Sequence, residues 1–284
     1  GANVIEALKA MGHDVVPVTL DADNVDNVPG DVDAAFLALH GGYGENGGAQ
    51  AALDARGIPY TGPGAAASRI TIDKIATKDV LKKAGVATAP WAILDHETAE
   101  CPIPLPVVVK PPKDGSSVGI SRVFKPEEWK DALALARKTD KDGLALVEAF
   151  VPGREWTVGI LAGKALPVIE IQAPNGWYGY QEKYLSNATK YVFPEDGADA
   201  ALKKLLKKAQ KTALAAYKAT GCPGVTRVDF RVSPEGETYV LELNTVPGFT
   251  AHSLVPKAAA RTGLDFAHMC EAILATAACD GTKR

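Results

Sequence analysis

The sequence lacks the features that would place it in several common classes of protein. It has only four cysteines in 284 residues, and no two of them lie in a CxxC spacing. A zinc site is therefore not expected, and free thiols predict a reducing compartment, the cytoplasm. No apolar stretch approaches the roughly 20 residues that span a bilayer, and no signal peptide opens the sequence. The cysteines are Cys101, Cys222, Cys270 and Cys279.

The sequence also lacks a strong charge of either sign. Its 31 basic and 34 acidic residues give a net charge of −3, so no broad basic surface for nucleic acid or an anionic membrane is expected. Any basic site must be local. Hydrophobic residues make up 46% and charged residues 23%, as in an ordinary globular protein. The length corresponds to about one to three packed units.

The first part of the chain alternates between helical and strand-like patterns. Residues 1–12 have helical spacing up to Gly12, and residues 47–57 form a second helix. Extended segments between and after them predict an open α/β layer of parallel strands. A strand normally precedes such a first helix, so we expect that a segment is missing before residue 1. The strands expected here are 14–20, 34–40 and 58–62.

The remainder of the chain predicts short strands, hairpins and amphipathic helices. A long irregular segment, 173–197, carries several aromatic side chains and is typical of a functional lid. The strand-like segments are 144–151, a hairpin over 155–171 that turns at Gly163, and a second hairpin over 226–232 and 238–244. The helices expected are 73–84, one begun by Pro126, 198–219 and two closing helices, the first over 253–262.

Residues 107–123, VVVKPPKDGSSVGISRV, raise the first question of function. An apolar run ends at Lys110, and a loop with Ser116 and Ser117 follows. A lysine that ends a buried strand needs a negative partner, and Gly/Ser loops offer amides and hydroxyls to an anion. The segment is therefore either a flap over the terminal phosphate of a nucleotide or a plain hairpin turn with an exposed lysine end.

Two later strands carry a second set of polar residues. Arg227 and Asp229 share one strand face, as do Glu242 and Asn244. If the strands pair as a hairpin, carboxylate and amide oxygens converge in one cleft and suit Mg²⁺. The arginine can then stabilise charge that develops in phosphoryl or acyl transfer. The alternative is a solvated face with a surface ion pair.

Other candidates depend on their surroundings. Lys74 and Lys78 lie one helical turn apart and form either a solvated face or, with Lys110 and residues 148–151, part of an adenine and phosphate pocket. The irregular segment is either a surface loop or a lid that brings a lysine to the phosphates. His40 is either a polar strand end or a ligand, and Ser253 is a candidate N-cap. The lid candidates are Tyr178, Lys183 and Tyr184.

Together and in this order, the motifs resemble D-alanine–D-alanine ligases of the ATP-grasp superfamily. The segments that carry the resemblance are LHGGYGENGGAQ, IPYTGPG, VVVKPPKDGSSVGISRV, LVEAFVPGREWTVGIL, EKY, TRVDFRV and LELNTVPGFTAHSLVP. The resemblance implies an α/β chain of the α+β ATP-grasp type. An N-terminal open α/β domain, 1–73, would precede two subdomains, 74–155 and 156–284, that hold ATP between them.

The resemblance also implies an activity. Such enzymes join two D-alanines through an acyl phosphate, release ADP and phosphate, and supply peptidoglycan synthesis. ATP and two Mg²⁺ ions, replaceable by Mn²⁺, are implied, as are a cytoplasmic location and a homodimer without nucleic-acid or membrane partners. The pair Lys183 and Tyr184 favours D-alanine over D-lactate as acceptor.

Residue roles follow from the same resemblance. Lys74, Lys110, Ser117 and Lys183 would meet the phosphates, while adenine and ribose would lie against Glu148, Phe150, Val151, Glu155 and Tyr178. The metal would be held by Asp229, Glu242 and Asn244. Arg227 and the Gly248 amide would stabilise the tetrahedral oxyanion, and Ser116 and Tyr184 would tie flap to lid. D-alanine would contact His40, Ser253 and Leu254.

Two departures from the family pattern leave alternatives open. The glutamate that binds the first D-alanine ammonium in the family has no counterpart here, and Asn46 replaces an aspartate at a turn that suits either residue. The alternatives are an ATP-grasp ligase for a different amino acid and a non-catalytic nucleotide-binding protein.

Overall fold

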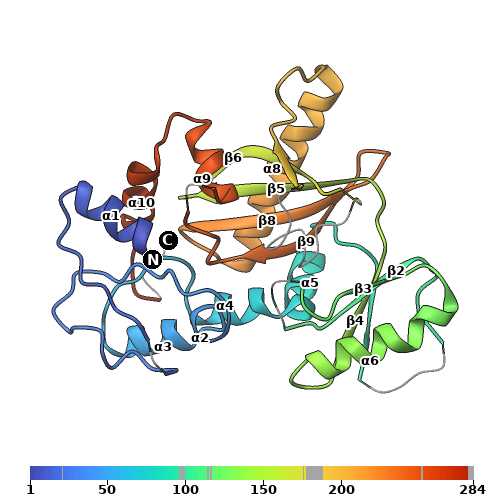
Figure 1. The fold of residues 1–284 in the computed structure, drawn as a ribbon, viewed down its shortest axis with the longest axis horizontal. Coiled ribbons are helices and arrows are strands. Elements are labelled where there is room, and N and C mark those ends of the chain that lie inside the picture. The colour runs from blue at the N-terminus through green and yellow to red at the C-terminus, as the bar shows by residue number, and fades with distance from the viewer. Residues whose placement is uncertain are drawn as a thin grey trace.

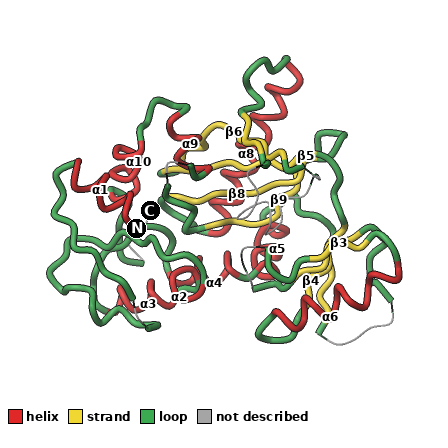
Figure 2. Tube along the Cα trace, viewed as in Figure 1, coloured by secondary structure: helices red, strands yellow, loops and turns green. Residues whose placement is uncertain are grey.

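The fold consists of two antiparallel sheets with helices packed on them and an N-terminal region at one end (Figure 1). It comes from a computed structural model, which describes residues 1–20, 22–95, 100–113, 115, 117–174, 176, 188–250 and 252–280. No helix in these ranges is long and apolar enough to cross a membrane. Figure 2 shows that the strands are concentrated in the two sheets, whereas the N-terminal region consists of helices and loops.

The first sheet has the strand order β1-β4-β2-β3, and all its pairs are antiparallel. Helix α6 packs on it through Trp129, Leu133 and Ala136, which are buried against Val107 and Val109. The hairpin of β2 and β3 carries the predicted flap. The elements are β1 (Trp91–Leu94), β2 (Val107–Lys110), β3 (Ser121–Val123), η1 (Pro126–Glu128), α6 (Trp129–Thr139) and β4 (Ala145–Ala149).

The second sheet has the order β7-β6-β5-β8-β9 and is covered on both faces. Strand residues alternate between the faces. Val168 therefore packs with the long helix α8, whereas Ile169 and Ile171 pack with α9 and α10. The elements are β5 (Arg154–Leu161), β6 (Lys164–Gln172), β7 (Lys190–Val192), α8 (Ala200–Thr220), β8 (Val225–Val232), β9 (Thr238–Asn244), α9 (Leu254–Ala260) and α10 (Phe266–Leu274).

The predicted hairpins are confirmed. The first turns at Ala162 and Gly163, both with positive φ (47° and 76°), which is the backbone that a two-residue hairpin turn requires. In the second hairpin, β8 and β9 place Asp229 opposite Glu242 and Arg227 opposite Asn244. Helix α9 is shorter than the predicted 253–262, and Ser253 precedes it without a capping hydrogen bond from its side chain.

The N-terminal region forms its predicted helices but not the predicted parallel ladder. Among the described residues, 14–20 has no strand pairing, and 34–40 pairs with 58–62 only through a single parallel bridge between Ala35 and Tyr60. Pro17 lacks the N–H that a ladder needs, and Pro59 adjoins the bridge. The helices are α1 (Ala2–Ala10), α2 (Gly42–Glu45), α3 (Gly48–Ala55), α4 (Ala65–Ile72) and α5 (Lys74–Lys83).

Helices at the two ends of the chain connect the N-terminal region to the second sheet. Helix α1 lies against α10 (Figure 1), and its residues Val4 and Leu8 share a core with Met269 and Ile273. Helix α5 contacts α8, so it lies between the two sheets. This arrangement brings the start of α5 to the same region as β4 and β9.

Candidate active site

A cleft between the two sheets gathers most of the residues that sequence analysis assigned to the nucleotide. Strands β2 and β4 supply one wall, and β8 and β9 supply the other. The predicted residues that line it are Lys74, Lys110, Ser117, Glu148, Phe150, Val151, Glu155, Asp229 and Glu242. Ala149, within the predicted segment 148–151, lines it as well, whereas sequence analysis missed Ala89, Val108, Ile120, Arg231 and Leu241, of which all but Arg231 are apolar.

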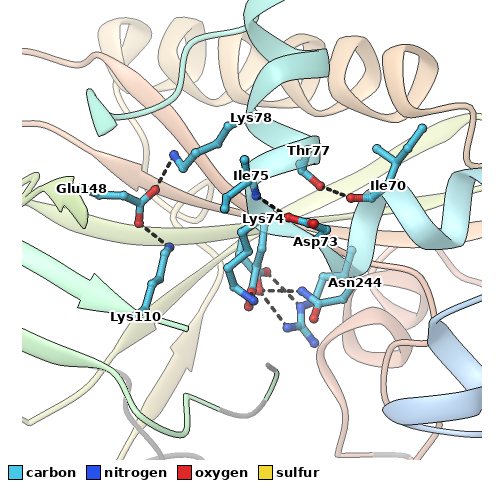
Figure 3. A network of polar contacts seen from close by, with 12 residues as sticks. Ile70, Asp73, Lys74, Ile75, Thr77, Lys78, Lys110, Glu148 and Asn244 are labelled. Carbon is cyan, nitrogen blue, oxygen red and sulfur yellow. Dashed lines mark hydrogen bonds and ion pairs between the residues drawn. The ribbon is translucent and has the colours of Figure 1, made fainter. Parts of the chain in front are cut away.

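Helix α5 places Lys74 at this cleft. Asp73 caps the helix by accepting hydrogen bonds from the amides of Ile75 (2.8 Å) and Ala76 (3.2 Å), which fixes the first turn (Figure 3). The Lys74 amide donates to the carbonyl of Pro112 (3.0 Å) and so anchors the loop after β2. The Lys74 ammonium lies 3.4 Å from a Glu242 carboxylate oxygen.

A buried ion-pair cluster forms part of the cleft wall, and of its members only Lys78 is absent from the described lining residues. The Glu148 carboxylate on β4 contacts Lys78 through Oε1 and Lys110 through Oε2, as Figure 3 shows. Burial alone would raise the pKa of Glu148, but the ammonium groups of Lys110 and Lys78 lower it to about 2. The solvated-face interpretation of Lys74 and Lys78 is therefore wrong, because both side chains are buried by partners from distant strands.

Arg231, which sequence analysis missed, holds the loop that follows β4. Its guanidinium donates to the carbonyls of Val151 (3.1 Å) and Gly153 (3.0 Å) and pairs with Glu155 (3.3 Å). It also lies 5.9 Å from the centre of the Phe150 ring. The only sequence signal was its place on β8, two residues after Asp229 and on the same strand face.

Asp229 is the centre of the second polar set. It accepts two hydrogen bonds from Arg227 (2.9 and 2.8 Å), one from Thr157 (2.7 Å) and one from the amide nitrogen of Asn244 (3.0 Å). The predicted convergence of these side chains is therefore present. Two carboxylates and an amide oxygen are hard ligands that suit Mg²⁺, which takes its remaining ligands from water and phosphates. The donor set therefore fits this ion.

His40 lies at the end of a Gly-rich loop near the second sheet. Its Nδ1 is 2.9 Å from the carbonyl oxygen of Val246, which makes it a partnered polar group. Glu45, a second missed residue, accepts a hydrogen bond from the Gly41 amide (2.6 Å). Burial raises the pKa of Glu45, while the Gly41 amide and His40 act to lower it. The signal for Glu45 was its place five residues after His40, at the end of the short helix α2.

Gly248 and Ser253 lie in direct proximity. A Cβ built on Gly248 would stand 2.6 Å from the Ser253 hydroxyl, so no larger residue fits without a shift. The Ser253 hydroxyl accepts a hydrogen bond from the Thr250 amide (3.1 Å) instead of capping α9. Leu254 begins α9 and is buried.

Comparison with known proteins identifies the family. Residues 80–275 match the family model described as the D-ala D-ala ligase C-terminus. The chain is 44% identical to a D-alanine–D-alanine ligase of Bordetella petrii over 87% of its own length and 76% of that protein. It is 41% identical to that of Anaeromyxobacter sp. (strain K) over 98% of its own length and 91% of that protein. The chain belongs to the D-alanine–D-alanine ligase family.

A solved ligase structure supports the same assignment at the level of fold. The Bacillus anthracis D-alanine–D-alanine ligase complexed with ATP superposes with a TM-score of 0.83 at 31% identity. The match covers 97% of this chain and 89% of that one. The α+β ATP-grasp fold class is therefore confirmed.

Some predicted ligase residues fall where no structural statement is made. Ser116, Tyr178, Lys183 and Tyr184 lie outside the described residues, as do residues 175 and 177–187 of the predicted lid over 173–197. Asn46, by contrast, is described: its side-chain oxygen accepts a hydrogen bond from the Gly48 amide (2.9 Å). This is the turn geometry expected for an aspartate or asparagine.

Proposed function

We propose that this chain joins two molecules of D-alanine to D-alanyl-D-alanine and converts ATP to ADP and phosphate in the same reaction. The product serves peptidoglycan precursor synthesis. The family relationship supports the reaction, and the observation that carries it is the single cleft that gathers Lys74, Lys110, Asp229 and Glu242 between two sheets. Cations for phosphates and oxygen ligands for a metal are what ATP-driven carboxylate activation requires.

The nucleotide is proposed to lie along the cleft between the sheets. Lys74, Lys110 and Ser117 meet its phosphates, while Phe150, Val151 and Glu155 bind adenine and ribose in the loop that Arg231 holds. Both oxygens of Glu148 are engaged by lysines. Its side chain therefore acts on the nucleotide by orienting Lys110.

Asp229, Glu242 and Asn244 would hold Mg²⁺, normally two ions, with Mn²⁺ as a substitute. The metal would neutralise phosphate charge as ATP transfers its terminal group. Asn244 uses its amide nitrogen for Asp229, which leaves its oxygen for the metal. Arg227 donates two hydrogen bonds to Asp229 and would hold this carboxylate in the orientation that a metal ligand needs.

The chemistry divides into two transfers. A carboxylate oxygen of the first D-alanine attacks the terminal phosphorus, the bond to the ADP oxygen breaks, and an acyl phosphate forms. The amine of the second D-alanine then attacks the acyl carbon and loses a proton, and the carbon–oxygen bond to phosphate breaks. Arg227 and the Gly248 amide stabilise the oxyanion between these steps, and positioning supplies much of the remaining rate.

The two amino acids are proposed to lie beyond the phosphates. His40 lies near the first carboxylate, and Ser253 and Leu254 receive the second at the start of α9. Ser116 of the flap and Tyr184 of the lid would connect these two segments over the site, and Lys183 of the lid would reach the phosphates. We also propose that the chain divides into three domains, 1–73, 74–155 and 156–284.

Location and assembly follow from the same proposal. An enzyme that consumes ATP and free amino acids works in the cytoplasm, and we propose a homodimer there. Sedimentation equilibrium over a range of protein concentrations measures the assembly. A mass of twice the chain is expected, and a monomer at all concentrations contradicts it.

Product analysis with a panel of amino acids tests the proposed reaction. The protein is incubated with Mg-ATP and D-alanine, L-alanine, D-serine or D-lactate, and products are identified by mass spectrometry. D-alanyl-D-alanine is expected as the main product, with one ADP for each dipeptide. A different dominant product would assign the chain to another ATP-grasp ligase. ATP binding without any product would support the non-catalytic alternative.

A further inference from the structure

Lys78 is a buried cation that the proposed mechanism does not use. It lies on α5 with 1% of its surface exposed, and its ammonium contacts Glu148 and the hydroxyl of Thr88 (Figure 3 shows the contact with Glu148). Thr88 in turn donates to the carbonyl of Val240 on β9 (3.0 Å). Lys78 is therefore held from two sides, by the first sheet and by a residue bound to the second.

Among the described residues, the charges in this cluster do not balance. Lys78 and Lys110 share one carboxylate, that of Glu148, which is itself 3% exposed. Burial lowers the pKa of Lys78, Glu148 raises it, and the charge of Lys110 lowers it further. One carboxylate with two ammonium groups leaves an excess positive charge, which an anion in the cleft can neutralise.

The two lysines differ in what they can reach. Lys110 lines the cleft, whereas Lys78 is absent from the described residues that line it. Only Lys110 can therefore turn from Glu148 toward an anionic ligand. When it does so, the buried carboxylate would lose its partner unless another cation remained, and an unpaired buried charge is strongly unfavourable.

We propose that Lys78 is a positioning residue that keeps the Glu148 carboxylate paired, so that Lys110 is free to bind a phosphate of the nucleotide. This inference rests on the proposed binding of ATP in the cleft. It assigns the three side chains different tasks. Lys110 binds the ligand, and Glu148 positions Lys110 while no ligand is bound. Lys78 keeps the Glu148 carboxylate paired when Lys110 turns to the ligand.

A double-mutant cycle on ATP affinity tests this assignment. Lys78→Met keeps the length of the side chain and removes its charge. The expected dissociation constant for Mg-ATP, measured by calorimetry, rises about tenfold or more, because Glu148 then retains Lys110. Lys83→Met, an exposed lysine on the same helix, is the matched control and leaves the constant within about twofold.

The second half of the cycle separates positioning from a merely structural role. With Glu148→Gln, no carboxylate competes for Lys110, so adding Lys78→Met to that variant is expected to change ATP affinity by less than about threefold. A structural role predicts further loss in the double variant. Melting temperatures are recorded for every variant. A positioning role predicts that the double variant regains the ATP affinity that Lys78→Met loses, even if its melting temperature stays low.

Each outcome decides one question. Wild-type protein that does not bind Mg-ATP contradicts the proposed function and this inference together. Wild-type binding with unchanged affinity in Lys78→Met overturns the inference alone. If Lys78→Met does not fold, the comparison of Glu148→Gln with the double variant remains decisive, since the double variant removes a cation together with its anion. A loss of about tenfold in that comparison would show that Lys78 acts without Glu148.

Discussion

Asp229 on β8 lies directly opposite Glu242 on β9, because the two strands pair in antiparallel register. The register also sets Arg227 opposite Asn244, so four functional side chains meet at one end of a hairpin. Strand geometry thus positions the proposed metal ligands, and neither carboxylate depends on a loop for its position. Lys74 lies 3.4 Å from Glu242 and connects this set to the nucleotide cleft.

Neutralising Asp229 is expected to weaken metal-dependent activity. Asp229→Asn keeps the shape of the side chain but removes a charge from the ligand set. The rate should fall roughly 10²-fold, and the Mg²⁺ concentration for half-maximal rate should rise. Initial rates over a Mg²⁺ titration measure both. Glu237→Gln, an exposed acid at the start of β9, is the control, and an unchanged titration in Asp229→Asn would rule out its role as a ligand.

Replacing Arg227 is expected to affect turnover more than ATP binding. Arg227→Met removes a proposed oxyanion-stabilising group, which costs roughly 10²–10³-fold in turnover. ATP affinity should change much less, because Arg227 is absent from the described residues that line the nucleotide cleft. Steady-state rates and calorimetry on the same preparation separate the two effects. Equal losses in both quantities would instead indicate that the arginine serves mainly to hold Asp229.

Replacing Arg231 is expected to affect ATP binding more than turnover. Its guanidinium holds two carbonyls and Glu155, and hydrogen bonds to charged groups contribute about 1.5–3 kcal/mol. Arg231→Met should therefore raise the KM for ATP about 10- to 100-fold, with a smaller change in turnover at saturating ATP. Arg231→Lys should recover only part of the affinity, since one ammonium cannot reproduce the planar fork. A KM for ATP equal to that of wild type in both variants would contradict the role.

The pKa of Glu148 predicts a pH dependence of stability. The pKa is about 2 in the folded protein, below its ordinary value of 4.5, so the native state favours the ionised form. The resulting stabilisation is fully present above about pH 4.5 and is lost as pH falls toward 2. Denaturant unfolding between pH 7 and 2.5 should show this loss in wild type.

Two variants isolate the contribution of Glu148. Glu148→Gln should be less stable than wild type at pH 7 but should lose less stability below pH 4.5. Glu127→Gln, an exposed residue beside α6, should follow the wild-type curve. Parallel curves for wild type and Glu148→Gln would mean that another carboxylate causes the acid sensitivity.

Local signals were sufficient for much of the fold. The turn at Gly163, the helix expected over 73–84 and the alternation along β8 and β9 can each be read from a few neighbouring residues. The strands predicted in the N-terminal region do not form a parallel ladder among the described residues. A strand requires a partner that its own residues do not reveal, and Pro17 interrupts the hydrogen-bonding pattern.

The site was predictable where side-chain chemistry itself was the signal. The carboxylates, Lys110 and the Gly/Ser loop were identified because their residue types suit phosphate and metal. Lys78 and Arg231 were misread or missed because their partners come from distant parts of the chain. Glu45 was missed although its hydrogen-bond partner, the Gly41 amide, is only four residues away. Lys78 has the local pattern of a surface lysine, and its burial is made possible by Glu148 on β4 and the hydroxyl of Thr88.

The transfer of oxygen from substrate to phosphate is the most direct test of the account. D-Alanine labelled with ¹⁸O in its carboxylate is supplied with Mg-ATP, and both products are analysed by mass spectrometry. The account predicts D-alanyl-D-alanine together with inorganic phosphate that carries one ¹⁸O atom, because the carboxylate oxygen leaves with the phosphate. Unlabelled phosphate, or ADP release that does not require D-alanine, would contradict it.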